Sequence, residues 1–189
     1  MQKIRILSSE DVLSLMTIKD ALEADEQAYL QKAAGHGSAW PMVFHEFTPG
    51  KADLDIKSGD LQDDGVFGFK LVSWFGENHE KGLPELYGTA MLFDITSGAP
   101  MALINAGALT GMRTGAAAAV GAKYLARHDA KSLLIVGTGT LAPYAAAATI
   151  LACPTIESVT FVNPHRPENT KAKLNTIREA VEKLLVKSD

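Results

Sequence analysis

An apolar run that ends in a glycine-rich turn constrains the fold of this chain more than any other sequence feature. The run covers residues 132–136, the turn reads Gly137-Thr138-Gly139-Thr140-Leu141-Ala142, and an alanine-rich segment follows. This pattern predicts a buried strand, a tight turn and the opening of a helix. Gly137 would permit the turn, Gly139 would let a pyrophosphate approach the backbone, and Ala142 would let helix and strand pack closely. The phosphate would lie on free N–H groups at the helix N-terminus.

The next predicted strand supports a dinucleotide site. It covers residues 157–162 and ends at Asn163, where the dinucleotide motif expects an acidic residue for the ribose hydroxyls. Asn163 is not acidic and Arg166 follows it, a combination that favours a 2′-phosphate and therefore NADP. Two alternatives stay open. In the first, the turn is an ordinary strand–helix connection with small residues for packing. In the second, Arg166 is a surface residue at a helix start.

The first part of the chain predicts a different architecture. Strand-forming segments follow one another there without intervening helices, after two helix starts near Ser9 and Thr17. The expected strands cover residues 3–7, 40–47, 53–58, 66–75, 87–94 and 99–104. Such a series predicts an antiparallel or mixed sheet. The fold class is therefore α/β, with an α+β domain over residues 1–128 and an incomplete Rossmann-like βαβα unit over residues 129–189.

Two cations occupy positions that need a reason. Lys70 stands between apolar neighbours in the middle of the predicted strand 66–75. It lies either on a solvated face of the sheet or beside an anion. Arg113 stands near the start of a helix predicted over residues 106–127, with Thr110 as its N-cap. A cation there opposes the helix dipole. Either an ordinary salt bridge or an anionic ligand would explain Arg113.

Composition excludes several function classes. The 189 residues carry a net charge of −4, which provides no basic field for nucleic acid. The N-terminus lacks the apolar segment of a signal peptide, and Lys123 and Pro143 interrupt the long apolar runs before they reach membrane-spanning length. We therefore expect a cytoplasmic protein. Cys153 is the one cysteine. His36 and His45 lack further ligands at metal-binding spacing, so we expect no metal site.

Four stretches in this order resemble the ornithine cyclodeaminase/mu-crystallin family. The stretch over residues 109–127 is a Leu-Thr-x-x-Arg-Thr helix start that leads into Lys-Tyr-Leu-Ala-Arg. Together with the Gly-x-Gly turn, it is the most specific of the four. The resemblance covers most of the chain and is least clear over the first 50 residues or so. The stretches are residues 68–72, residues 82–94, residues 109–127 and residues 135–139.

The resemblance implies a two-domain enzyme that acts on a small amino or imino acid with NAD or NADP. Its N-terminal domain would bind substrate and form a homodimer through the sheet, and its Rossmann domain would hold the cofactor. Lys70 and Arg113 would hold the substrate carboxylate. Thr140 and Leu141 match turn positions that touch the cofactor, and Asn163 matches the ribose-reading position. The candidate cofactor-binding residues are Gly137, Thr138, Gly139, Thr140, Leu141, Asn163 and Arg166.

The implied reaction begins with hydride transfer from the amino acid Cα to the nicotinamide. The resulting imine would be attacked by a side-chain amine, lose ammonia and be reduced again, as in the conversion of ornithine to proline. Relatives instead stop at a keto acid or run in the imine-reducing direction. An alternative is a non-catalytic, mu-crystallin-like binding protein or a structural dimer remnant. A short-chain Rossmann protein outside this family is disfavoured, because its glycine-rich turn would lie close to the N-terminus.

The sequence also departs from the family pattern. The arginine usual after a proline is absent near Pro41, although Lys57 supplies a cation nearby, and Glu85 stands where a threonine that contacts the cofactor is common. The aspartate that acts as general acid and base would lie beyond Asp189, so we expect no catalytic residue in this chain. Two parallel strands would leave apolar edges unpaired. We therefore expect an N-terminal fragment or truncated product without turnover.

Overall fold

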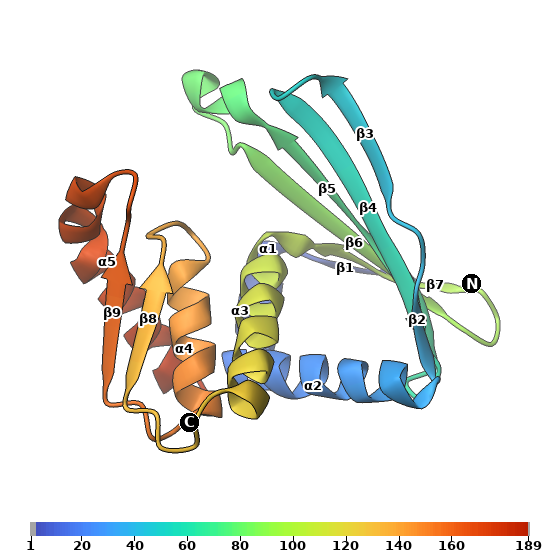
Figure 1. Ribbon diagram of the computed structural model, residues 1–189. Coiled ribbons are helices and arrows are strands. Elements are labelled where there is room, and N and C mark those ends of the chain that lie inside the picture. The colour runs from blue at the N-terminus through green and yellow to red at the C-terminus, as the bar shows by residue number, and fades with distance from the viewer. Residues whose placement is uncertain (1–2, 189) are drawn as a thin grey trace. The chain divides into compact units, whose positions relative to one another are not determined.

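The computed structural model describes residues 3–188 and divides into two compact units, which are treated separately below. Unit 1 contains residues 3–15 and 28–110, and unit 2 contains residues 16–27 and 111–188. Helices α2 (Ile18–Ala34) and α3 (Ala106–Leu125), both labelled in Figure 1, each contribute residues to both units. A single functional boundary after residue 128 stays a prediction.

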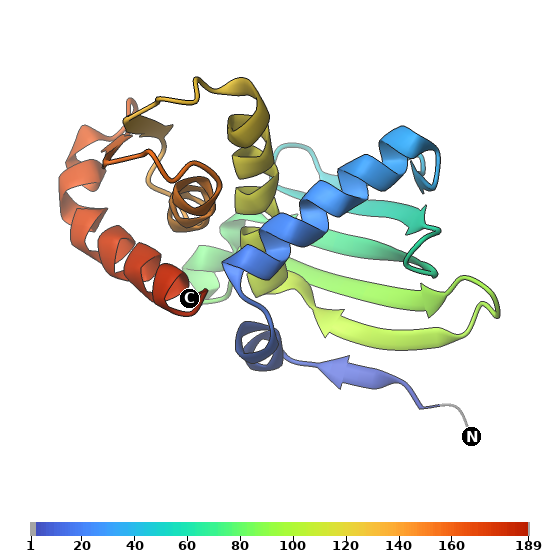
Figure 2. The ribbon, with the colours of Figure 1, turned by 90° about the horizontal axis from the view of Figure 1, so that it is seen from below.

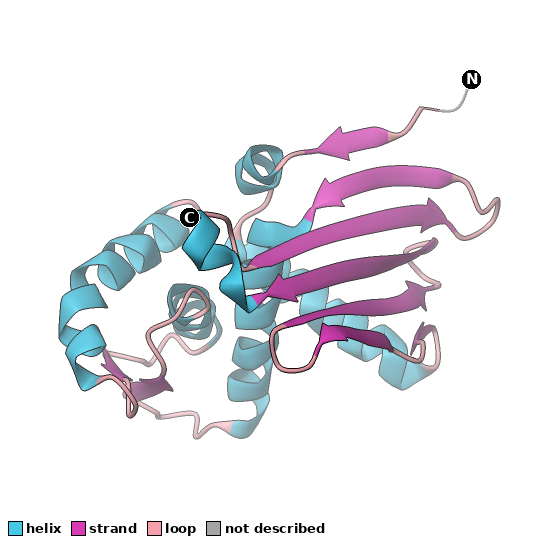
Figure 3. Cartoon of the chain, turned by 90° about the horizontal axis from the view of Figure 1, so that it is seen from above, coloured by secondary structure: helices cyan, strands magenta, loops and turns pink. Residues whose placement is uncertain are grey.

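Unit 1 is built on a mixed sheet, as the series of strand-forming segments predicted. The strand order is β1-β7-β6-β5-β4-β2, with β3 also paired to β4 (Figure 3). Strand β1 is parallel to β7, and the other pairs are antiparallel. The elements of this unit, besides the parts of α2 and α3, are β1 (Arg5–Leu7), α1 (Ser9–Leu15), β2 (Gly37–Ala39), β3 (Val43–Thr48), β4 (Ala52–Leu61), β5 (Val66–Phe75), η1 (Gly76–Lys81), β6 (Leu86–Asp94) and β7 (Pro100–Asn105).

Two strand predictions need correction. The predicted strand 40–47 is β3, which begins three residues later, at Val43, and ends at Thr48, and the short β2 before it was not predicted. The predicted strand 53–58 is the centre of the longer β4, which pairs with β5 along its whole length, from Ala52↔Phe75 to Leu61↔Val66. In β4 every second residue shares a face, which is how charged side chains alternate with apolar ones along it.

The start of α3 also differs from the prediction. The helix begins at Ala106, and the side-chain Oδ1 of Asn105 accepts the N–H of Gly107 at 3.0 Å, which is an N-cap contact. Thr110 is therefore not the N-cap. Its hydroxyl donates to the carbonyl of Ala106 at 2.6 Å inside the helix. Arg113 consequently lies in the helix body, so the expected conflict with the N-terminal dipole does not arise.

Unit 2 contains the predicted strand–turn–helix region. Strands β8 (Ser132–Val136) and β9 (Ser158–Val162) are parallel and paired along their whole length. Helix α4 (Ala142–Ala152) packs on β8, and α5 (Pro167–Val186) packs on β9 and on α4 (Figure 2). The buried core of this unit joins the start of α2 to α3 and α4 through Ile18, Ala21, Leu22, Met112, Ala116, Ala119, Val120, Ala147 and Ala148.

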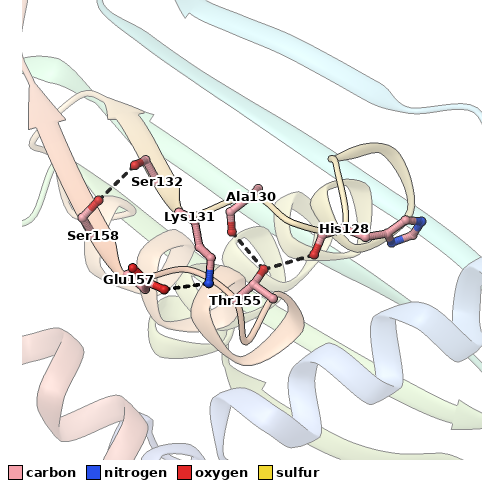
Figure 4. Close-up of polar contacts among 7 residues, drawn as sticks. All are labelled: His128, Ala130, Lys131, Ser132, Thr155, Glu157 and Ser158. Carbon is pink, nitrogen blue, oxygen red and sulfur yellow. Dashed lines mark hydrogen bonds and ion pairs between the residues drawn. The ribbon is translucent and has the colours of Figure 1, made fainter.

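The beginnings of β8 and β9 are tied together by polar contacts (Figure 4). Lys131 forms an ion pair with Glu157 at 2.6 Å, and the hydroxyl of Ser158 donates to that of Ser132 at 3.1 Å. The hydroxyl of Thr155 donates to the carbonyl of Ala130 at 2.9 Å. These contacts fix the register at this end, and the opposite, carboxyl ends of both strands lead into the candidate cofactor residues. None of the helices in the described part of the chain combines the length and apolar character needed to cross a membrane.

Candidate functional site

The glycine-rich turn has one glycine that the backbone requires and one that protein packing does not. Gly137 has φ of 124°, a conformation that L side chains rarely adopt, and its N–H donates to the carbonyl of Val162 at 2.7 Å. A Cβ at Gly139 would meet no described protein atom within 4 Å. Packing between strand and helix therefore does not explain Gly139. The open space beside it is what a ligand that approaches the backbone would need.

An open groove of about 470 Å³ runs along this turn and the first turn of α4. Among the residues that the structure describes, no side chain caps the start of α4, which has a proline at its first or second position. The positive end of the helix dipole and N–H groups of the first helical turn would therefore favour an anion at this place. The groove is lined by Ile135, Val136, Gly137, Gly139, Thr140, Leu141, Ala142 and Ala145.

Thr138 does not line this groove. Its side chain is buried, and its hydroxyl accepts a hydrogen bond from Nδ2 of Asn163 at 3.0 Å. The Oδ1 of Asn163 accepts the backbone N–H of Arg166, also at 3.0 Å. Thr138 and Asn163 thus join the turn after β8 to the end of β9, while Arg166 is exposed. The preference for NADP over NAD stays a prediction.

Lys70 lies in the centre of the sheet of unit 1. In the register of β5 it stands opposite Lys57 of β4 on one side and Ala90 of β6 on the other. Lys70 is partly buried, and its ammonium donates to the hydroxyl of Thr110 at 3.3 Å. Lys57 forms an ion pair with Asp55 at 2.7 Å. Lys70 therefore does not lie on a fully solvated face, because the hydroxyl of Thr110 accepts a hydrogen bond from its ammonium.

Arg113 of unit 2 carries a buried donor without a partner. Among the described residues nothing accepts a hydrogen bond from its Nε, although that atom is out of contact with solvent. The carboxyl group of Asp25 in α2 interacts electrostatically with the guanidinium of Arg113. Burial raises the pKa of Asp25 to about 6, and the positive charge of Arg113 lowers the pKa in part. Buried donors are normally hydrogen-bonded, so the Nε of Arg113 fits an anionic ligand.

The structure thus groups the predicted residues in two sets. Gly137, Gly139, Thr140 and Leu141 line one groove of unit 2, and Arg113 belongs to the same unit. Lys70 belongs to unit 1, so a common carboxylate site with Arg113 stays a prediction.

Sequence reasoning missed two partners of these cations. The acceptor role of Thr110 depends on where α3 begins. Asp25 had a readable signal, because it follows Ile18 by seven residues and so continues the apolar stripe of α2 with a carboxylate.

Comparison with known proteins gives a consistent assignment. The sequence model of the ornithine cyclodeaminase/mu-crystallin family matches residues 2–188. Alanine dehydrogenase of Archaeoglobus fulgidus is 36% identical over 137 residues, which cover 72% of this chain and 41% of that protein. Iminosuccinate reductase of Paracoccus denitrificans is 31% identical over 184 residues, which cover 94% of this chain and 57% of that protein.

Solved structures agree on the fold. The iminosuccinate reductase of Paracoccus denitrificans in complex with NAD+ aligns with a TM-score of 0.82 at 26% identity, over 97% of this chain and 55% of that one. The Thermococcus litoralis Δ1-pyrroline-2-carboxylate reductase in complex with NADH and L-proline aligns with a TM-score of 0.76 at 30% identity, over 96% and 55%. The chain spans about half the length of these relatives.

Proposed function

Because the chain belongs to the ornithine cyclodeaminase/mu-crystallin family, we propose that it binds NAD or NADP and serves the oxidation or reduction of a small amino or imino acid. Relatives named alanine dehydrogenase, Δ1-pyrroline-2-carboxylate reductase and iminosuccinate reductase support this reaction class. The observation that carries the proposal is the open space at Gly139 beside the uncapped start of α4. When bound, the nicotinamide would supply the hydride acceptor or donor.

The residues of this chain would bind and orient the reactants. The backbone at Gly139, Thr140 and Leu141 would hold the pyrophosphate at the N-terminus of α4. Lys70 and Arg113 would each contribute a positive charge to the substrate carboxylate. The hydroxyl of Thr110 would orient the ammonium of Lys70, which it already meets. Holding a substrate in one orientation against the cofactor is a positioning contribution to catalysis.

We also propose that the sheet of unit 1 forms a homodimer. Its side chains support this, because large aromatic residues on it are exposed. Phe47 is 52% exposed and stacks on Phe75, which is 37% exposed, with a distance of 5.7 Å between their ring centroids. Tyr87 is 46% exposed. Exposed apolar surface of this kind is typical of interaction sites. One solved relative is an alanine dehydrogenase dimer with bound NAD.

Replacing Gly139 by alanine tests the cofactor site. We expect Gly139→Ala to weaken NADH binding roughly tenfold or more, because the added methyl group occupies the space that the pyrophosphate would need. The melting temperature should stay unchanged, because no protein atom lies near the new Cβ. Binding would be measured by NADH fluorescence and by calorimetry. Gly121→Ala, an equally unhindered substitution in α3, is the matched control and should bind NADH like the unmodified chain. Equal affinity in both variants would refute the assignment.

A further inference from the structure

Two lysines face each other across neighbouring strands of unit 1. The register of β4 and β5 places Lys57 directly opposite Lys70, so both side chains leave the same face of the sheet. Directly opposed residues on antiparallel strands have Cβ atoms roughly 4.5–5.5 Å apart, and like charges in such a pair are destabilising. Two lysines at opposed positions therefore favour anionic groups nearby.

A carboxylate of the same strand compensates the charge of Lys57. Asp55, two residues before Lys57 on the same face, forms an ion pair with Lys57 at 2.7 Å. Lys70 meets a neutral hydroxyl, that of Thr110. Asp53 stands further along β4, where the register sets it opposite Glu46. The register thus places Asp53 beside Glu46 at one point of β4, and Lys57 beside Lys70 at another.

Exposure decides which of these groups is available to a ligand. The side chain of Lys57 is 50% exposed, whereas that of Asp55 is 24% exposed. An ammonium has three donors, and Asp55 is the one carboxylate partner that Lys57 has among the described residues. Lys57 can therefore bind a second carboxylate from solvent while it stays paired with Asp55.

We propose that Lys57 determines substrate specificity by binding a second carboxylate, so that the substrate is a small dicarboxylic amino or imino acid. The proposal rests on the proposed function, in which Lys70 binds the first carboxylate. The two carboxylates of such a substrate would each meet one of the two ammonium groups. Charge-assisted contacts of this kind are the strong ones in proteins, and they discriminate against a substrate with an apolar end.

Three four-carbon probes separate the choices at the second position. Succinate, butyrate and 4-aminobutyrate share one carboxylate and carry a second carboxylate, a methyl group or an ammonium at the other end. Their dissociation constants for the chain would be measured by calorimetry, in the presence of NADH. We expect succinate to bind about tenfold or more tightly than butyrate, and 4-aminobutyrate to bind least tightly.

The variants assign the preference to a residue. Lys57→Met should reduce the succinate affinity to that of butyrate and leave butyrate binding unchanged, while Lys57→Arg should retain the preference. Lys70→Met should weaken all three probes. Circular dichroism and melting temperature would show that each variant is folded, which the half-exposed position of Lys57 favours.

The outcomes separate the two proposals. Equal binding of succinate and butyrate, with both lost in Lys70→Met, would overturn the role of Lys57 and leave that of Lys70. Preference for 4-aminobutyrate that disappears in Asp55→Asn would overturn it in favour of a substrate with a distal ammonium. Affinities that do not respond to Lys70→Met, or no measurable binding of any probe, would count against both assignments.

Discussion

The packing of α3 against α4 gives the sharpest stability prediction, at Gly115. A Cβ at this position would lie 2.5 Å from the carbonyl carbon of Tyr144, 2.6 Å from its oxygen and 2.9 Å from the nitrogen of Ala145. All three atoms belong to the backbone of α4, so no side-chain rotation can relieve the contact. Gly115→Ala therefore requires the two helices to move apart.

The expected cost follows from two opposing effects. Overpacking a core costs roughly 1–3 kcal/mol, and the rigid backbone partner places Gly115→Ala near the upper value. Replacing glycine by alanine inside a helix returns about 1 kcal/mol. The net loss of unfolding free energy is then about 2 kcal/mol. In a chain of this size each kcal/mol changes the melting temperature by roughly 2–4 °C, so we expect a decrease of about 4–8 °C.

Gly121→Ala is the matched control, because it makes the same substitution in the same helix where a Cβ would meet nothing within 4 Å. It should raise the unfolding free energy by roughly 0.5–1 kcal/mol. Both variants would be compared with the unmodified chain by scanning calorimetry and by urea denaturation followed by circular dichroism. A Gly115→Ala variant as stable as Gly121→Ala would refute the close approach of α3 and α4.

Two further predictions concern pH. The pKa of Asp25 is raised to about 6 from 3.8 by burial, with Arg113 opposing, so the folded state binds more protons between these values and stability falls as pH rises through them. Asp25→Asn should therefore raise the unfolding free energy at pH 7.5 by about 1 kcal/mol, a value discounted for partial exposure, and should leave it unchanged at pH 3.5. Urea denaturation at both pH values measures this difference. An equal effect at the two pH values would contradict the prediction. The hydroxyls of Thr96 and Ser97 hold the pKa of Asp94 at about 2, below its usual 3.8. The stabilisation is present above pH 3.8 and lost as pH falls toward 2, which NMR titration of the Asp94 carboxyl would show and a midpoint near 3.8 would contradict.

Sequence reasoning located the elements whose pattern is local. Strand β5 runs from Val66 to Phe75 as predicted, because a run rich in aromatic and β-branched residues stands between two turns. Strand β2 was missed, because its three residues, Gly37 to Ala39, carry no apolar pattern and are held by pairing with the distant β4. The start of α3 was misplaced for another reason. Asn105 and Thr110 are both good capping residues, and only the folded backbone shows which one caps.

The same distinction applies to the candidate site. The turn at Gly137 and Gly139 was readable, because a strand, a turn and a helix adjacent in sequence create the groove together. Lys70 was recognisable as an unusual residue, but its neighbours Thr110 and Lys57 come from other elements, so no local pattern indicates them. A charged residue in an apolar run therefore indicates that its charge needs a partner from another element. The register of the paired strands then identifies which residues stand beside it. For Lys70 that partner set includes a second lysine, and this pairing is what makes the substrate class testable.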